Sequence, residues 1–294
     1  MRILVLGGSG MLGTDLVSEV RSRRHEVVAP ATPEDLDITD PSAMARLGSG
    51  ELGQFDWVLN CAAYTAVDKA ESEVREATEI NVLGPGYLAE AVKGIGAKLI
   101  HISTDFVFDG RATEPYAEDA PTNPLGVYGR TKRDGEEAVL DANPNALVVR
   151  TAWLYGPNGA SFPRTMILAM EAGKNLRVVA DQTGCPTYTA DLARVLLDLV
   201  ERNAFPGIYH AGGPEAMTWH EFATRAIRAW TKSGAPTPRY GTVIEPIKTE
   251  DWPTPAARPK YSVLGMAKLE ALGIEPMRPV DDALAEFCSR LKIL

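Results

Sequence analysis

Cysteine, histidine and long apolar runs are all scarce in this chain of 294 residues. The three cysteines, Cys61, Cys185 and Cys288, are odd in number and far apart. This pattern is typical of free thiols in a reducing compartment and differs from that of a disulfide framework. The four histidines form no pair at metal-ligand spacing with cysteines nearby. A structural zinc is therefore not expected, and no residue is assigned to a metal.

The chain also lacks an apolar run of roughly 18 residues, the length that a membrane-spanning helix needs. Its start, Met1-Arg2 followed by ILVLGGSGMLG, superficially resembles the charged and apolar regions of a signal peptide. No A-x-A-like cleavage site follows, and a buried strand that enters a glycine turn is the better interpretation. We therefore predict a cytoplasmic protein without a membrane partner.

Basic residues are in deficit as well, because 30 Lys and Arg stand against 39 Asp and Glu and leave a formal net charge of −9. Such a chain lacks the basic surface through which proteins bind phosphates, so no nucleic-acid partner is expected. An anionic substrate would need a local cluster of Arg, Lys or backbone N–H groups. The length fits two domains or one large α/β unit.

Short apolar runs alternate with helical periodicity in the first half of the chain. Strands are predicted at 3–6, 26–29, 57–60, 98–103 and 146–150. Between them we predict a first helix that ends near 21–24, a long helix over about 69–93, and a helix capped by Asn123 with Pro124 at its first position. These repeated units indicate an α/β fold with a doubly wound parallel sheet, the Rossmann fold.

The regular alternation ends near residue 150, where we divide the chain. Residues 1–150 are expected to form a dinucleotide-binding Rossmann domain. Pro and Gly interrupt residues 151–294 more often, and we expect a smaller α/β part there that mainly binds substrate. A strand near 207–211 is expected to rejoin the sheet, so the division is not one clean cut.

A glycine-rich turn lies between the first strand and the first helix. Gly7, Gly10 and Gly13 would allow a tight turn, close approach to a pyrophosphate and close helix–strand packing. A glycine turn without a ligand is the alternative, but the strand–turn–helix context favours a dinucleotide site.

The end of the second strand bears on which dinucleotide binds. Residues 27–32 contain no acid that would hold the ribose hydroxyls of NADH and repel the 2′-phosphate of NADPH, and no Arg follows to bind that phosphate. Asp37 is placed to meet the adenine edge, although an ordinary loop or cap aspartate explains it equally well.

Tyr128 and Lys132 are spaced i, i+4 and would share one helix face. A nearby ammonium group would lower the pKa of the phenol and suit it to acid–base catalysis. Gly126 and Gly129 in the same predicted helix suggest that a ligand or another backbone packs closely there.

The run Ser103-Thr104-Asp105 ends a predicted strand at the carboxyl edge of the sheet, where ligands of open α/β sheets bind. A hydroxyl there could hydrogen-bond a substrate carbonyl beside the tyrosine. A Ser/Thr helix or turn cap is the competing interpretation.

Five motifs stand in one register along the chain. They are Gly7-x-x-Gly10-x-x-Gly13, Asn60-Cys61-Ala62-Ala63, Ser103-Thr104-Asp105, Tyr128-x-x-x-Lys132 and RTAWLYGP over 150–157. Together they resemble those of the extended short-chain dehydrogenases/reductases. Within that superfamily the chain is similar to the dTDP-4-dehydrorhamnose reductases. The closer signatures are TAVDKAE (65–71), STDFVFDG (103–110), DQTGCPT (181–187) and PTPAARP (253–259).

This resemblance implies a catalytic set of Thr104, Tyr128 and Lys132. Tyr128 would protonate the C4 oxygen of the sugar as NAD(P)H delivers hydride, Lys132 would hold the nicotinamide ribose and lower the pKa of the tyrosine, and Thr104 would polarise the ketone. The positions that match cofactor contacts of the family, together with the glycine turn, are Gly7, Gly10, Met11, Leu12, Gly13, Asp37, Ile38, Ala62, Ala63, Tyr64, Tyr128 and Lys132. Those assigned to the substrate are Thr104, Asp105, Trp153 and Arg258.

Two of the assignments have simpler explanations. Trp153 could be a core indole, and Arg258 could be a solvated loop residue instead of a bidentate partner for the pyrophosphate. His101 is interpreted as a packed strand residue and not as a catalytic one.

The implied activity is reduction of dTDP-4-dehydro-6-deoxy-L-mannose to dTDP-L-rhamnose with NADPH, or with NADH. One alternative is another nucleotide-sugar enzyme of the superfamily, such as an epimerase or a dehydratase, but Phe106 stands where the dehydratases have Glu. Another is a regulatory subunit that only binds the cofactor. The residues leave open the nucleotide base, the cofactor preference, a Mg²⁺ requirement and the formation of a homodimer.

Overall fold

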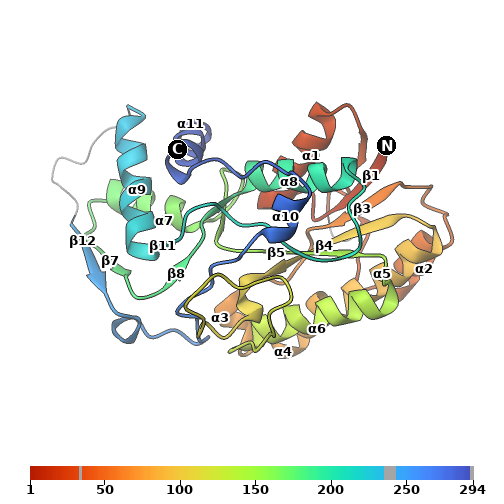
Figure 1. The fold of residues 1–294 in the computed structure, drawn as a ribbon, viewed down its shortest axis with the longest axis horizontal. Coiled ribbons are helices and arrows are strands. Elements are labelled where there is room, and N and C mark those ends of the chain that lie inside the picture. Colours follow the sequence, from red (N-terminus) through yellow and green to blue (C-terminus); the bar gives the residue numbers. More distant parts are fainter. Residues whose placement is uncertain (33–34, 235–242, 292–294) are drawn as a thin grey trace.

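A six-stranded parallel sheet forms the centre of the protein, as the computed structural model shows for residues 1–32, 35–234 and 243–291 (Figure 1). The strand order is β10-β5-β4-β3-β1-β2. The strands are β1 (Arg2–Leu6), β2 (Glu26–Val28), β3 (Trp57–Asn60), β4 (Lys98–Thr104), β5 (Leu147–Thr151) and β10 (Gly207–His210). The predicted α/β fold with a doubly wound parallel sheet is confirmed.

Both faces of the sheet are covered because its strands are apolar on both sides. Helices α1 (Met11–Ser22) and α8 (Thr189–Glu201) pack on one face, where residues such as Leu16 and Leu196 are fully buried. Helices α2 (Pro41–Gly48), α5 (Gly84–Gly94) and α6 (Val127–Ala142) cover the other. Figure 1 shows the two sets of helices on opposite sides of the strands.

The chain changes direction across the sheet after β2. It runs from β1 to β2 on one side and then crosses back to β3 on the other side of β1. Ligands of open α/β sheets bind at such a switch point, beyond the carboxyl ends of the strands. Leu6 and Asn60, the last residues of β1 and β3, are direct partners at this edge.

Two helix predictions need correction. The helix expected over 69–93 is interrupted: α3 (Val67–Ala70) ends before α4 (Val74–Thr78), a π-helical segment (Glu79–Leu83) follows, and Pro85 lies in the first turn of α5. The helix expected to start at Pro124 starts at Val127 with Gly126 as its cap. Asn123 does not cap it, because its side chain donates to Asp109 and its backbone N–H to Val107.

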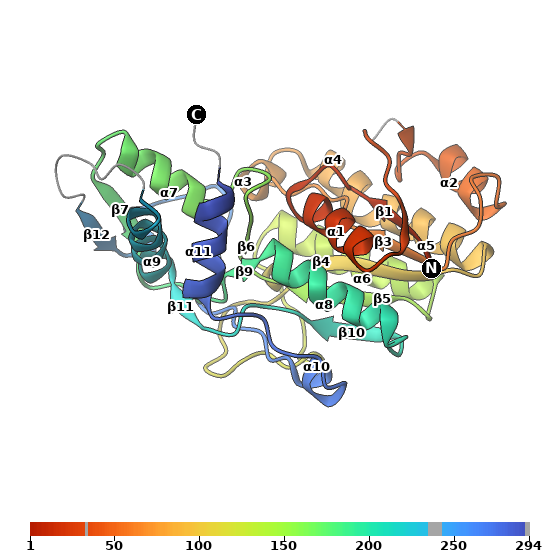
Figure 2. The ribbon, with the colours of Figure 1, turned by 90° about the horizontal axis from the view of Figure 1, so that it is seen from above.

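A second lobe lies beside the sheet (Figure 2). It contains α7 (Phe162–Glu171), α9 (Trp219–Lys232), α11 (Val280–Arg290) and the parallel pair β7 (Leu176–Val179) and β12 (Ile244–Ile247). Its core is rich in aromatic side chains, among them Tyr155, Phe222 and Phe287. β10 belongs to the sheet although it lies far along the chain, and the division at residue 150 stays a prediction.

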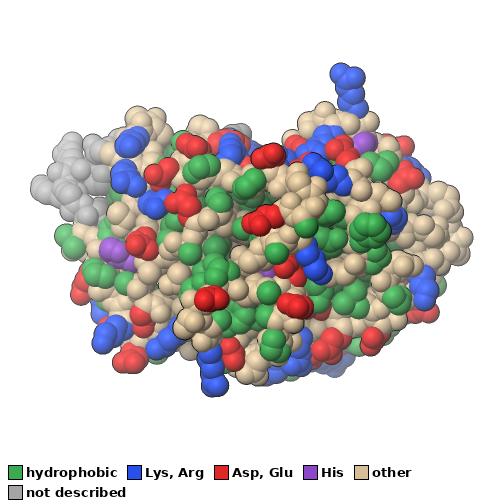
Figure 3. Space-filling model, in the orientation of Figure 1, with side chains coloured by type: hydrophobic (Ala, Val, Ile, Leu, Met, Phe, Trp, Pro, Cys, Tyr) green, Lys and Arg blue, Asp and Glu red, His purple; other side chains and the backbone are tan. Residues whose placement is uncertain are grey.

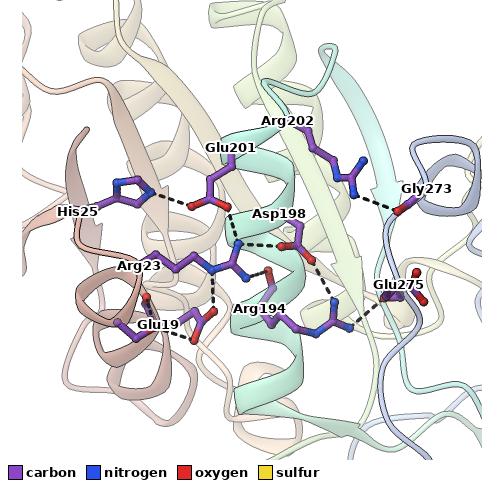
Figure 4. Close-up of polar contacts among 10 residues, drawn as sticks. Glu19, Arg23, His25, Arg194, Asp198, Glu201, Arg202, Gly273 and Glu275 are labelled. Atoms are coloured by element: carbon purple, nitrogen blue, oxygen red, sulfur yellow. Dashed lines mark hydrogen bonds and ion pairs between the residues drawn. The ribbon is translucent and has the colours of Figure 1, made fainter.

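Ion pairs fasten α1 to α8 (Figure 4). Arg23, which follows α1, is the centre of this group, with three carboxylates at 2.7 Å: Glu19, Asp198 and Glu201. Arg194 and Arg202 extend the network from α8 to backbone oxygens of 272–276. Acidic and basic side chains are otherwise interspersed over the face shown in Figure 3.

Within residues 1–32, 35–234 and 243–291, no helix is long and apolar enough to cross a membrane. In the same ranges, no three His, Cys, Asp or Glu side chains converge as metal ligands would.

Candidate active site

The glycine turn after β1 is closely packed against the end of β3. Gly7 has a positive φ of 70°, which favours glycine, and a Cβ there would lie 2.8 Å from the backbone nitrogen of Ala62. A Cβ on Gly13 would overlap the carbonyl oxygen of Gly7. Both glycines are therefore required by the backbone path itself.

The turn leads into the N-terminus of α1, which is open to an anion. Gly10 caps this helix without a side-chain hydrogen bond, so its first-turn N–H groups are not covered by a capping side chain. A cavity of about 400 Å³ lies next to it, bordered by the ends of β1, β2 and β3. Its lining includes Gly7, Gly10, Asp37, Ile38, Ala62 and Ala63. These residues fit a dinucleotide, with its pyrophosphate at the helix N-terminus.

Asp35 and Asp37 are described residues of the loop that follows β2 beside this cavity. Asp37 lines the cavity, and its side chain accepts hydrogen bonds from the backbone and hydroxyl of Thr39 at 2.8 Å. Asp35 accepts the backbone N–H of Thr32 at 2.9 Å. Asp35 was not predicted from the sequence, and it occupies a backbone donor at the end of the 27–32 segment, where a 2′-phosphate would be expected.

Tyr128 is in the first turn of α6, beside Thr104 at the end of β4. Burial raises the pKa of Tyr128 to about 12, a hydrogen bond with Thr104 acts in the opposite direction, and the Asp105 carboxylate raises it further. The sequence predicts that Lys132 lowers this pKa. In the structure Lys132 is not among the groups that shift this pKa, and burial raises it instead of lowering it.

Lys132 is one turn further along α6 and is 2% exposed. Its Nζ donates to the carbonyl oxygen of Ile102 at 2.7 Å and lies 3.5 Å from Nε2 of His101. Burial lowers the pKa of Lys132 to about 8, while Glu136 and Cys61 raise it. At neutral pH the lysine is therefore still mostly protonated, but much closer to titration than a surface lysine.

Backbone contacts fix the position of α6. A Cβ on Gly129 would overlap the carbonyl oxygen of Phe106, so the helix lies directly on the segment that follows β4. The carboxylate of Glu71 accepts the backbone N–H of Val127 at 2.7 Å and caps the helix from outside. The close backbone packing predicted from Gly129 is confirmed.

Thr104 and Asp105 share a hydrogen bond at the end of β4. The Thr104 hydroxyl donates to Asp105 Oδ1 at 3.1 Å and accepts the backbone N–H of Phe106 at 3.2 Å. Asp105 is 1% exposed. Burial raises its pKa to about 6, against hydrogen bonds from Ser262 and Thr104 that lower it.

A second cavity, of about 350 Å³, lies in the other lobe. It is bordered by aromatic, apolar and basic side chains: Phe162, Met166, Arg177, Val178, Val179, Gln182, Trp219, Trp252, Thr254 and Arg258. Trp153 stacks on Trp219 with ring centroids 3.4 Å apart and planes within 6°. Trp153 therefore supports the cavity through Trp219, and it adopts a positive φ of 47° to do so.

Arg258 borders this cavity and also joins the two lobes. Its guanidinium forms two hydrogen bonds with Asp68, at 2.8 and 3.0 Å, and a third with Ala256 O at 2.9 Å. Asp68 belongs to the TAVDKAE signature after β3. Arg258 is thus neither a solvated loop residue nor free of protein partners, and its assignment to a pyrophosphate stays a prediction.

Several contacts of the site were not predicted from the sequence. Asp68 and Glu71 were named only within the TAVDKAE signature after β3, whose acidic residues were the signal available for them. Trp219 could not be predicted as a site residue, because no motif in the sequence pairs it with Trp153. His101 is packed in its strand as predicted, and it also contacts Lys132.

Comparison with known proteins gives a consistent family. The family model described as RmlD substrate binding domain matches residues 1–293. The chain is 41% identical to a dTDP-4-dehydrorhamnose reductase of Mycolicibacterium smegmatis, over 97% of this chain and 84% of the relative. It is 44% identical to a Streptomyces antibioticus protein named probable dTDP-4,6-dihydroxy-2-methyloxan-3-one 4-ketoreductase, over 97% and 94%.

A solved structure agrees with these relatives. The dTDP-4-dehydrorhamnose reductase of Bacillus anthracis in complex with NADP is 34% identical, covers 97% of this chain and 98% of its own, and has a TM-score of 0.89. Since both the family model and these relatives span nearly the whole chain, the chain belongs to the RmlD family of dTDP-4-dehydrorhamnose reductases.

Proposed function

We propose that this protein reduces the C4 ketone of dTDP-4-dehydro-6-deoxy-L-mannose and releases dTDP-L-rhamnose for cell-surface polysaccharide synthesis. The proposal rests on the placement of Thr104, Tyr128 and Lys132 at the carboxyl edge of the sheet. Cys61 lines the glycine-lined cavity and lies close enough to Lys132 to influence the pKa of that lysine. The NADP complex of the Bacillus anthracis relative supports NADPH as the reductant.

NADPH, when bound, supplies a hydride to C4 of the sugar. Tyr128 gives its phenolic proton to the C4 oxygen. Because its pKa is about 12, Tyr128 is a protonated phenol at neutral pH, which is the form a proton donor requires. Thr104 would orient the phenol and the ketone oxygen, and Lys132 would hold the cofactor ribose.

The two cavities give the cofactor and substrate separate places. The glycine-lined cavity would hold the cofactor through Gly7, Gly10 and the N-terminus of α1. We place the nucleotide of the substrate in the aromatic cavity, where Trp219 offers a stacking face and Arg177 and Arg258 offer positive charge. This arrangement provides the local basic groups that an acidic chain needs for an anionic substrate.

NADPH preference, compartment and assembly are finer proposals. The loop after β2 carries no Arg in its described residues, so both cofactors should work and NADPH should be favoured only modestly. All three cysteines are free thiols, which supports a reducing cytoplasm. A homodimer and a Mg²⁺ requirement stay open as proposals for solution measurements.

A second candidate function is reduction of a different dTDP-linked 4-keto sugar, since the Streptomyces antibioticus relative is named for one. NADPH oxidation measured against a panel of dTDP- and UDP-linked 4-keto sugars separates the two. The proposal requires the highest kcat/KM for dTDP-4-dehydro-6-deoxy-L-mannose. A higher value for another sugar would assign that substrate instead, and an absence of turnover with all of them would favour a regulatory subunit.

A further inference from the structure

A buried histidine lies behind Lys132 and has no part in the reaction as described above. His101 is 1% exposed. Its Nδ1 is 3.1 Å from Asn60 Nδ2, and its Nε2 is 3.5 Å from Lys132 Nζ. Asn60 and His101 are direct partners across β3 and β4. His101 therefore connects the central strands with the lysine on α6.

The Asn60 amide determines which ring nitrogen of His101 carries the proton. The backbone N–H of Ala62 donates to Asn60 Oδ1 at 3.1 Å, so the amide oxygen faces Ala62 and the amide nitrogen faces the histidine. That nitrogen only donates, so Nδ1 of His101 must accept. Burial and the charge of Lys132 hold the pKa of His101 well below its usual value. The ring is therefore neutral, and its single proton is on Nε2.

The Nε2–H group of His101 faces Lys132 and interacts differently with the two protonation states of this lysine. An ammonium group has three donors and no acceptor, so it would meet Nε2–H donor against donor. A neutral amine has a lone pair that can accept from Nε2–H. Both the ammonium and the neutral amine of Lys132 can donate the hydrogen bond to the Ile102 carbonyl. His101 thus favours the neutral amine.

We propose that His101, held in its Nε2–H tautomer by Asn60, is a positioning residue that stabilises the neutral amine of Lys132 and so makes the ammonium form of this lysine give up a proton more readily. This inference rests on the proposed reduction. When Lys132 titrates, its ammonium releases one N–H proton to the solvent, and the amine that remains accepts a hydrogen bond from His101 Nε2–H.

The pKa of Lys132 agrees with this influence, because it is lowered to about 8. Burial is the largest cause of that shift. Two other groups influence Lys132, namely Glu136 one turn further along α6 and Cys61 after β3, and both favour the ammonium. Among these neighbours, His101 is the one that disfavours the ammonium, because its Nε2–H group is a second donor facing it.

The tautomer and the lysine titration can both be measured without substrate. Nitrogen-15 NMR of histidine-labelled protein reports which ring nitrogen of His101 is protonated. Carbon-13 NMR of lysine-labelled protein reports the titration of Lys132, with the signal assigned by its loss in Lys132→Met. We expect an Nε2–H ring throughout and a Lys132 midpoint near pH 8. An Nδ1–H tautomer, or a midpoint near the ordinary lysine value, would overturn the proposal.

Two variants test the causal link. His101→Gln presents an amide oxygen that can turn to the ammonium, and Asn60→Asp accepts from Nδ1 and so directs the bare Nε2 at Lys132. Each should raise the Lys132 midpoint by about one pH unit or more and move the basic limb of the kcat profile with it. His25→Gln, at a partly buried histidine that pairs with Glu201 far from Lys132 in the sequence, is the matched control and should leave the midpoint unchanged.

The outcomes separate this inference from the proposed function. If both variants fold, as judged by thermal unfolding, and leave the Lys132 midpoint unmoved, the inference is wrong even when the reduction is confirmed. If the midpoint moves but no 4-keto sugar is reduced, the proposed function is wrong and the influence of His101 on Lys132 stands.

Discussion

The phenol of Tyr128 is the single group on which the proposed chemistry depends most. Tyr128→Phe removes the proton donor and leaves the glycine turn untouched. We expect kcat to fall at least about 100-fold, the usual scale of general acid catalysis, with nearly unchanged NADPH affinity. Stopped-flow turnover and cofactor titration measure the two effects. Tyr87→Phe on α5 is the control, and near-normal turnover of Tyr128→Phe would exclude the tyrosine as the acid.

Asp105 makes stability depend on pH in an unusual direction. Its pKa is about 6 in the folded protein, above the unfolded value near 3.9, so the folded state keeps a proton that the unfolded chain has already released. Its contribution is favourable below about pH 4 and is lost as the pH rises through 6. Asp105→Asn should therefore stabilise the protein above pH 6, by up to ~3 kcal/mol, and change little at pH 4.

Urea unfolding at pH 4 and pH 8 checks this sign. Asp109→Asn is the matched control, because hydrogen bonds from Asn123, Arg111 and Tyr116 outweigh the effect of burial and lower the pKa of Asp109. Its loss should destabilise the protein at pH 8. Equal effects of the two substitutions would contradict the assignment.

Cofactor preference is determined by the few residues that follow β2. Ala31→Asp adds a carboxylate within residues 27–32, which have none, and it should shift kcat/KM toward NADH by opposing the 2′-phosphate charge. The wild-type preference for NADPH should stay below about 100-fold, or roughly 3 kcal/mol. Asp35→Asn should act in the opposite direction, because it removes the charge next to Thr32. A strong wild-type preference for NADH would show that the ribose site is misplaced.

Residues of the candidate site could be predicted from the sequence where the residue types and spacing of a motif already indicate how its backbone packs. Gly7, Gly13 and Gly129 are glycines because another backbone is in contact, and their spacing predicted it. Protonation states could not be found in this way. The pKa of Tyr128 depends on how deeply it is buried, and burial is a property of the assembled fold and not of the i, i+4 spacing.

At the scale of an element, the N-terminus of α6 depends on a carboxylate from another segment. Glu71→Ala should remove the cap on Val127, lower stability by about 1 kcal/mol and reduce kcat, because Tyr128 is in the same turn. Glu71→Gln keeps an acceptor oxygen and should recover most of the loss. Thermal unfolding and turnover measure both, with Glu90→Gln on the exposed side of α5 as the control. A silent Glu71→Ala would mean that the helix start needs no cap.

Element boundaries were harder to predict than element types. The strand at 57–60 agrees fully with the structure, because a buried parallel strand is a short, continuous apolar run. The helix start near Pro124 was wrong because Asn123 bonds to Asp109, a partner that local sequence does not reveal. The break before α4 and the π-helical segment place Asn81 against Tyr64 and Thr131, which again is a tertiary effect.

At the scale of the whole molecule, the network around Arg23 joins the first helix to the eighth. Arg23→Met would leave three carboxylates close together without their shared cation. We expect a loss of ~2 kcal/mol in urea unfolding, smaller at high salt because the carboxylates repel one another less. Arg75→Met is the control, since that side chain is 92% exposed and its pair with Glu79 contributes little. Equal losses would show that the network is not structural.

The second lobe could be predicted only in outline. Its strands are short, and several have two residues, so periodicity gives little signal there. The pairing of β7 with β12 joins segments about 70 residues apart, as the partnership of Leu176 with Ile244 shows. The aromatic cavity arises from that pairing and from the placement of α9, and no local pattern contains it.

The stacked indoles of Trp153 and Trp219 also give the protein an optical property. Two parallel rings this close share their electronic excitation, so they should produce a paired near-ultraviolet circular dichroism signal and quench each other's fluorescence. Trp219 borders the aromatic cavity, and a ligand that displaces it would uncouple the rings. Substrate capture could then be followed in the unlabelled protein, by light alone, before any hydride is transferred.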